Sequence, residues 1–196
     1  MKTRFLIAGP ALALALVLGG CGRKSDDVAI NNMSTMNDGA MGGMTNDTAS
    51  TMPMTSPAQS FANTAAASDM FEVESSKLAL SKSSSASVKK FADMMVKAHT
   101  ESTEKLKTAA GSATPPVVPN AALSAEQQAT MDKLNSASGS AFDTAYIAAQ
   151  TDGHQKTLDA LRAYSASGDV PALKTLAGDM VPTVTAHLNM AKGLKP

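Results

Sequence analysis

The sequence has few of the residues on which disulfide-rich domains and many binding proteins depend. It contains one cysteine and no tryptophan in 196 residues, and aromatic residues make up only 4% of the chain. A single cysteine cannot form a disulfide within the chain. Any folded domain must therefore be held together by packed side chains rather than by covalent cross-links.

The chain also has no excess of either charge, because its 17 Lys and Arg residues equal its 17 Asp and Glu residues in number. Without a basic stripe the chain has no electrostatic basis for binding nucleic acid. The sequence also has no phosphate-binding loop, dinucleotide fingerprint, His-Glu-x-x-His motif or catalytic-triad context. We therefore assign no catalytic or cofactor-binding residues, and a non-enzymatic role is favoured.

The N-terminus resembles a bacterial export signal. Lys2 and Arg4 precede an apolar run over 5–20, which is shorter than the roughly 20 apolar residues of a membrane span. Its end, Leu18-Gly19-Gly20-Cys21, resembles the lipobox of lipoproteins. We expect 1–20 to be a signal peptide and Cys21 to carry the lipid that attaches the protein to a membrane; the alternative is an unmodified thiol. Residue 22 is Gly rather than the Asp that retains lipoproteins at the inner membrane, which favours the outer membrane, facing the periplasm.

Residues 21–58 are predicted to be a disordered linker, because they are rich in Ser, Thr, Asn, Asp, Gly and Met and poor in branched apolar residues. The methionines are paired in sequence: Met33 with Met36, Met41 with Met44, and Met52 with Met54. Thioethers are soft ligands that suit Cu(I), so copper capture is one interpretation. A low-complexity spacer that tolerates methionine is the other, and it is favoured.

Residues 59–196 are predicted to fold as an all-α domain. Apolar residues recur at helical spacing, and no alternating strand pattern is present. Long helices are expected over 61–81, 86–110, 140–166 and from about 171 to 194, with a short helix over 124–135 that opens on a capping box. Four amphipathic helices with mostly short links indicate an antiparallel four-helix bundle.

Three histidines, the only ones in the chain, lie within the apolar stripes of three different helices. His99 follows Met95 by four residues, His154 precedes Leu158 by four, and His187 follows Met180 by seven. If the long helices alternate in direction, the three histidines lie within about one helical turn of the same depth. Glu74 falls between apolar residues of the first helix and is the expected carboxylate neighbour, whereas Asp69 and Glu72 are predicted to point away.

Three imidazoles and a carboxylate in a bundle core could bind Zn, Cu, Ni or Fe. The predicted metal ligands are His99, His154, His187 and Glu74. Asp143, Gln150 and Tyr146 are further polar residues near His154. The alternative is that each histidine completes the core and bonds to a neighbouring polar group, as buried polar groups usually do. The protein would then be a structural or interaction lipoprotein without a metal.

The landmarks of the folded region resemble one known family. They are Phe71-Glu72-Val73-Glu74, the run from Phe91 to His99, Phe142-Asp143-Thr144-Ala145-Tyr146, His154-Gln155, and Pro182 followed by His187. In this order they are similar to the exported bacterial family called domain of unknown function 4142. The resemblance implies a ferritin-like bundle and an exported location, and it implies little about activity.

Iron chemistry does not follow from that fold. Ferritin-type di-iron sites use Glu-x-x-His on two helices, whereas the residues three positions before the histidines are Val96, Thr151 and Val184. The sequence thus predicts a lipid-anchored envelope protein of uncharacterised activity, with a candidate site for one transition metal ion.

Overall fold

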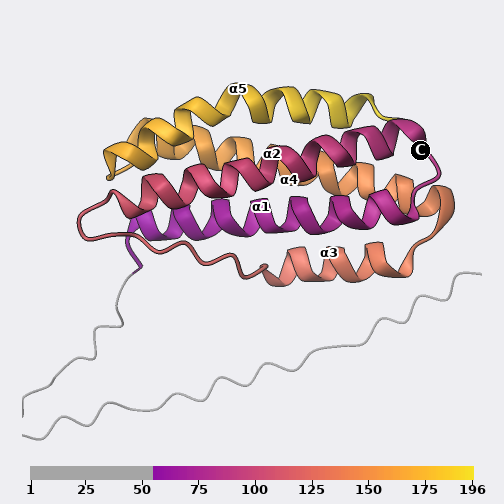
Figure 1. The fold of residues 1–196 in the computed structure, drawn as a ribbon, viewed down its shortest axis with the longest axis horizontal. Coiled ribbons are helices and arrows are strands. Elements are labelled where there is room, and N and C mark those ends of the chain that lie inside the picture. Colours follow the sequence, from indigo (N-terminus) through magenta and orange to yellow (C-terminus); the bar gives the residue numbers. More distant parts are fainter. Residues whose placement is uncertain (1–54) are drawn as a thin grey trace, which may run out of the picture. The chain divides into compact units, whose positions relative to one another are not determined.

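The computed structural model describes residues 55–196, which form five helices (Figure 1). They are α1 (Pro57–Lys82), α2 (Ala86–Gly111), α3 (Ala125–Ser136), α4 (Gly139–Ser167) and α5 (Pro171–Gly193). The predicted all-α class is confirmed. The signal, Cys21 and the methionine pairs lie outside the described residues, and α1 takes in the last two residues assigned to the linker.

Local sequence accounts for several helix ends. The Ser56 side chain accepts a hydrogen bond from the Gln59 backbone N–H at 3.1 Å, and Pro57 suits the first turn because it lacks an N–H. The predicted capping box at the start of α3 is present, with Ser124 and Gln127 exchanging bonds. The helix α5 runs without a break through Pro182, whose side chain is exposed.

The four long helices form two helical hairpins, α1 with α2 and α4 with α5, which pack against each other through α1–α4 and α2–α5. Neighbouring long helices are antiparallel, and α3 lies outside the bundle against α1 and α4 (Figure 1). Because the chain runs back along the bundle through α3, helices α2 and α4 start at the same end. The long link therefore sets both helices in the same direction.

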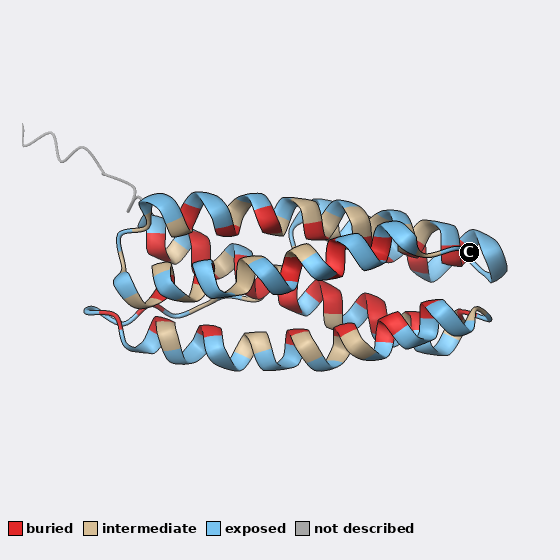
Figure 2. Ribbon diagram, turned by 90° about the horizontal axis from the view of Figure 1, so that it is seen from above, coloured by how far each residue is buried: buried red, intermediate tan, exposed pale blue. Residues whose placement is uncertain are grey.

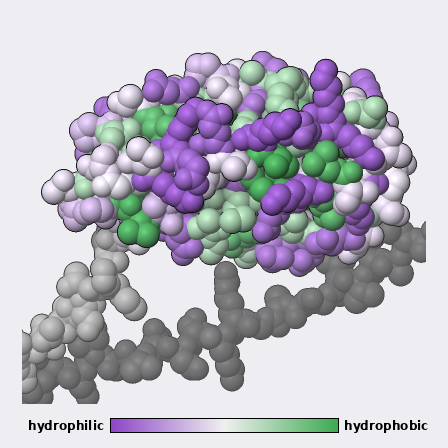
Figure 3. Space-filling view, in the orientation of Figure 1, coloured by the Kyte–Doolittle hydropathy of each residue, from purple (hydrophilic) through white to green (hydrophobic). Residues whose placement is uncertain are grey.

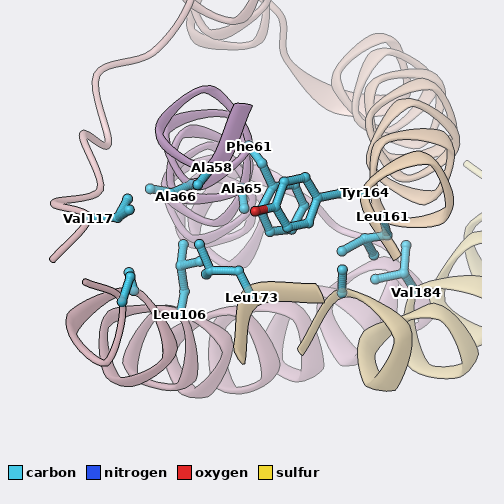
Figure 4. Packing of buried hydrophobic residues seen from close by; sticks show 14 of the residues in the cluster. Ala58, Phe61, Ala65, Ala66, Leu106, Val117, Leu161, Tyr164, Leu173 and Val184 are labelled. Atoms are coloured by element: carbon cyan, nitrogen blue, oxygen red, sulfur yellow. The ribbon is translucent and has the colours of Figure 1, made fainter. Parts of the chain in front are cut away.

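Buried residues face the interior along all four long helices (Figure 2). The apolar ones form two separate clusters. The first surrounds Phe61 and Tyr164, whose rings stack with centroids 4.0 Å apart (Figure 4). The second surrounds Phe91, Phe142 and Tyr146. Between the two clusters the interior is polar, and this layer is where the candidate site lies.

The outer surface mixes hydrophilic and hydrophobic side chains on the face shown in Figure 3. Such a mixed face is ordinary for a folded domain in water, where single apolar residues are often exposed. Within the part of the chain that the structure describes, no helix combines the length and the hydropathy that a membrane crossing requires.

Candidate metal centre

The three histidines meet in the polar layer between the two apolar clusters. His99 comes from α2, His154 from α4 and His187 from α5, and all three are buried. Their ring centroids are 5.5 Å apart for His99 and His154, 5.7 Å for His99 and His187, and 5.6 Å for His154 and His187. The prediction that they lie at one depth is confirmed.

The predicted depth was right although two helix directions were wrong. We expected α2 and α5 to run in one direction and α4 in the other, but α2 and α4 are both antiparallel to α1, and α5 is antiparallel to α2 and α4. Hydrogen bonds from α4 to successively earlier residues of α1, Tyr146 to Ser76 and Thr157 to Ser68, show the antiparallel pairing of these two helices. Because His154 lies near the middle of α4, reversing that helix hardly changes its depth.

Each ring has one buried nitrogen with no hydrogen-bond partner among the described residues. These atoms are Nε2 of His99, Nε2 of His154 and Nδ1 of His187. One nitrogen from each ring lies within 4.8 Å of the others. A metal with bonds of about 2.0–2.1 Å would hold tetrahedral nitrogens about 3.4 Å apart, so each ring would move by about 0.8 Å toward the centre if all three nitrogens were 4.8 Å apart.

The other nitrogen of His99 is held by a carboxylate. Nδ1 of His99 lies 2.7 Å from Oδ1 of Asp69 on α1, and both side chains are buried. Thr103 donates its hydroxyl to the second carboxylate oxygen at 3.4 Å. When Nδ1–H donates to Asp69, the lone pair of the neutral ring is on Nε2. This carboxylate–histidine arrangement is the one that orients many metal-binding imidazoles.

The tautomer of His154 is fixed in a similar way. Its Nδ1 lies 2.8 Å from the backbone carbonyl of Gln150, which can only accept, so Nδ1 carries the proton and Nε2 the lone pair. Glu72 Oε1 lies 3.5 Å from the same Nδ1. Gly153 makes room for this carboxylate, since a Cβ there would lie 3.1 Å from Glu72 Oε1. A side chain at residue 153 would therefore press on Glu72.

Burial and mutual repulsion keep two of the rings neutral. Burial, followed by the charge of His99, lowers the pKa of His154 to about 3 and that of His187 to about 4. For His99, burial lowers the pKa, but the hydrogen bond to Asp69 and the charge of Glu72 outweigh it and raise the pKa above its ordinary value. Burial raises the pKa of Glu72 to about 7. Neutral imidazoles are the form that binds metals.

Glu74 does not belong to this layer. It lies on the exposed face of α1, so the prediction that it faces the histidines is wrong. The buried stripe of α1 follows a regular spacing of four and three residues: Ala58, Ala62, Ala65, Asp69, Glu72, Ser76 and Ala79. The prediction missed Asp69 and Glu72 because it followed the bulky apolar residues. The alanine spacing was the signal that would have found them.

The other polar residues near His154 form a network of their own. Tyr146 and Ser76 share a hydrogen bond between hydroxyl oxygens 2.8 Å apart, and Gln150 donates to Ser75 at 3.2 Å. Asp143 is buried on the same helix, with one carboxylate oxygen lacking a described partner. Glu72 Oε2 and Gln150 Oε1 also lack a hydrogen-bond partner among the described residues, so the α1–α4 side of the layer is only partly satisfied.

Two pockets approach the layer from opposite sides. One, of about 440 Å³, lies between α2 and α5, and its lining includes His99 and His187. The other, of about 370 Å³, is lined by residues of α1, α3 and α4 and the link before α3, and includes Glu72 but none of the three histidines. Of these two pockets, the one between α2 and α5 is the one that imidazole rings line.

Comparison with solved structures shows the same helical fold. The Cu(I)-bound form of CopM is 20% identical and aligns over 69% of this chain and 93% of that chain, with a TM-score of 0.58. The Cu(II)-bound form is 18% identical over 71% and 96%, with a TM-score of 0.59. The apo form is 20% identical over 69% and 93%, with a TM-score of 0.57. At these identities the likeness shows the fold alone.

No curated protein matches the sequence. A family model does match, over residues 43–194, and it is described as a domain of unknown function, DUF4142. The match covers most of the chain, all three histidines and the buried carboxylates Asp69, Glu72 and Asp143.

Proposed function

The chain belongs to the DUF4142 family, and we propose that it binds one copper ion through His99, His154 and His187. The observation that carries the proposal is that one nitrogen of each ring lies within 4.8 Å of the others in a buried layer. Each ring also has a buried nitrogen with no hydrogen-bond partner among the described residues. Buried polar atoms nearly always have a hydrogen-bond partner. A purely structural role accounts for the bonded Nδ1 of His99 and of His154, and it leaves the partnerless nitrogens of the three rings unexplained.

The donor set favours a single ion of low charge. Asp69 and Glu72 approach the Nδ1 side of His99 and His154, away from the nitrogens that carry the lone pairs. They therefore orient rings rather than offer oxygen atoms to the same ion. Three imidazoles without a bound carboxylate suit copper or zinc better than a di-iron centre, which uses several glutamates.

Copper is chosen over zinc on two further grounds. Copper forms the stronger complexes with nitrogen ligands among the divalent first-row metals. The structurally similar CopM has been crystallised in Cu(I)-, Cu(II)- and Ag-bound forms. That likeness extends to the fold and supports the choice of metal without supplying any ligand residue.

Copper stoichiometry of the full-length chain tests the proposal. The wild-type protein should retain about one more copper ion per chain after dialysis than a His99→Ala, His154→Ala double variant. Copper held by the methionines of 33–54 is common to both proteins and cancels in the difference. A Glu74→Gln variant is the matched control, because Glu74 is exposed, and it should retain copper like the wild type. Equal copper contents in the wild type and the double variant would refute the proposed site.

We also propose that the domain is held outside the cytoplasm by lipid on Cys21, at the outer membrane facing the periplasm. The support is the sequence: the basic start, the apolar run, the lipobox-like residues and Gly22. Labelled fatty acid should enter the wild-type chain in bacterial cells and not a Cys21→Ala variant. Equal labelling of the two chains would contradict the anchor.

A further inference from the structure

We propose that the pocket between α2 and α5 is the route by which a soft metal ion reaches the histidines, and that the thioether of Met180 is its first ligand. The inference rests on the proposed copper site and adds a named residue and a selectivity to it. Soft ions here are Cu(I) and Ag(I), which sulfur ligands prefer.

The pocket has the position that such a route requires. It has a volume of about 440 Å³, and two of the three histidines, His99 and His187, are among the residues that line it. His154 does not line the pocket and lies behind them in the layer. The pocket on the opposite side of the bundle includes no histidine, and Glu72 is the residue of the layer that it reaches. An ion that enters between α2 and α5 therefore meets the side chains of two histidines.

Met180 is the one sulfur ligand among the residues that line this pocket. It is half-buried on α5, and Ser102 of α2 directs its hydroxyl at the sulfur with Oγ and Sδ 3.9 Å apart. The thioether therefore faces α2 across the pocket rather than solvent. Leu176 and Val184 also line this pocket and supply branched apolar groups. Met180 adds a sulfur ligand to that apolar lining.

The spacing along α5 separates Met180 from the histidine site. Met180 precedes His187 by seven residues, which is about 10.5 Å along a helix. The two residues therefore lie about two helical turns apart on α5. In this route Met180 is a transient ligand that the soft ion leaves when it binds to the histidines. Met180 therefore contributes little to the final affinity of the protein for the ion.

Selectivity follows from the chemistry of the thioether. Sulfur ligands of this kind bind Cu(I) and Ag(I) well, whereas Zn(II) is bound in proteins by thiolates, imidazoles and carboxylates. Glu101 and Asp179 at the same pocket attract any cation, and Glu101 is already paired with Lys105 at 2.7 Å. The carboxylates therefore do not distinguish copper from zinc. The thioether of Met180 does, because it binds Cu(I) in preference to Zn(II).

Loading kinetics of the full-length chain test this route. The metal-free protein withdraws Cu(I) from a coloured bicinchoninate complex, and the fading of the colour gives the rate. Met180→Leu should slow Cu(I) loading by about tenfold, the change that about 1.4 kcal/mol in the barrier produces. Its equilibrium Cu(I) affinity and its rate of Zn(II) loading should remain as in the wild type.

Met190→Leu is the matched control, because Met190 is an exposed methionine of the same helix that does not line the pocket. Uptake that persists in the His99→Ala, His154→Ala double variant belongs to other methionines and is subtracted. Equal Cu(I) rates in the two methionine variants overturn the route while leaving the copper site intact. Equal slowing of Zn(II) also overturns it, since a general packing defect explains that result. A wild-type chain with no histidine-dependent uptake overturns both proposals.

Discussion

Replacing His154 by leucine should stabilise the metal-free protein and abolish its stabilisation by copper. His154 is 1% exposed, and its Nε2 has no hydrogen-bond partner among the described residues. Its Nδ1 does bond, to the Gln150 carbonyl at 2.8 Å. That carbonyl is the acceptor of the ordinary helical bond from the His154 backbone, so it stays satisfied when the side chain is replaced.

The magnitude follows from these two nitrogens. An unpartnered buried polar atom costs about 1–3 kcal/mol, and one ordinary hydrogen bond contributes about 1 kcal/mol. Replacing a buried side chain by an apolar one of similar size costs less than about 1.5 kcal/mol in packing. We expect His154→Leu to raise the free energy of unfolding by about 1 kcal/mol, which for a domain of this size raises Tm by about 3 °C.

The assay is thermal and urea unfolding at pH 7 with and without copper. Thr144→Leu, at an exposed position of α4, measures what leucine adds through helix propensity alone. At a free copper concentration 100 times Kd the wild type should gain about 2.7 kcal/mol, and His154→Leu should gain almost nothing. A loss of more than about 1 kcal/mol in the metal-free variant, with copper stabilisation retained, would refute the reasoning and favour a structural histidine.

Three other outcomes are expected. Asp69→Asn should weaken copper binding by about 10- to 100-fold in a chelator competition, because the carboxylate that orients His99 is lost; unchanged affinity would remove Asp69 from the site. Metal-free stability should fall as the pH drops below 6.5, by about 1.4 kcal/mol per pH unit for each proton, because the unfolded chain protonates histidines whose folded pKa values are about 3 (His154) and about 4 (His187). Glu72, with its folded pKa near 7, opposes one of them between pH 4.5 and 7, and His187 stops contributing below its folded pKa of about 4. The steepest loss should therefore come near pH 4 to 4.5, and a flat profile from pH 6.5 to pH 4 would contradict neutral buried rings. Gly153→Ala should weaken copper binding more than Gly178→Ala on α5, since only the former presses on Glu72; equal affinities would separate Glu72 from the site.

The helices and the interior position of the histidines could be predicted from the sequence for the same physical reason. Both depend on which residues share a helix face, and His99 and His154 share theirs with apolar neighbours that mark the interior clearly. The first helix gives a weaker signal, because its inner face is built from alanines interrupted by Asp69 and Glu72. Hydrophobic size then favoured Met70, which is 39% exposed, and with it the wrong carboxylate, Glu74.

The tertiary arrangement could not be predicted from the periodicity of the helices. The direction of α4 depends on the long link through α3, and the periodicity of single helices carries no record of it. The pairing of Asp69 with His99 also depends on the rotation of α1 against α2, which a single helix does not fix. The pocket between α2 and α5 exists only because two helices from different hairpins meet there.

The placement of the histidines over the two hairpins gives the metal a structural consequence as well as a chemical one. Packing is more extensive within each hairpin, α1 with α2 and α4 with α5, than between them. His99 belongs to the first hairpin, whereas His154 and His187 belong to the second. A single ion bound to all three would therefore join the two hairpins near the middle of their helices. It would do so beside the pocket between α2 and α5. The ion would bind in the polar layer between the two apolar clusters, and its bonds to the three histidines would link the two hairpins there.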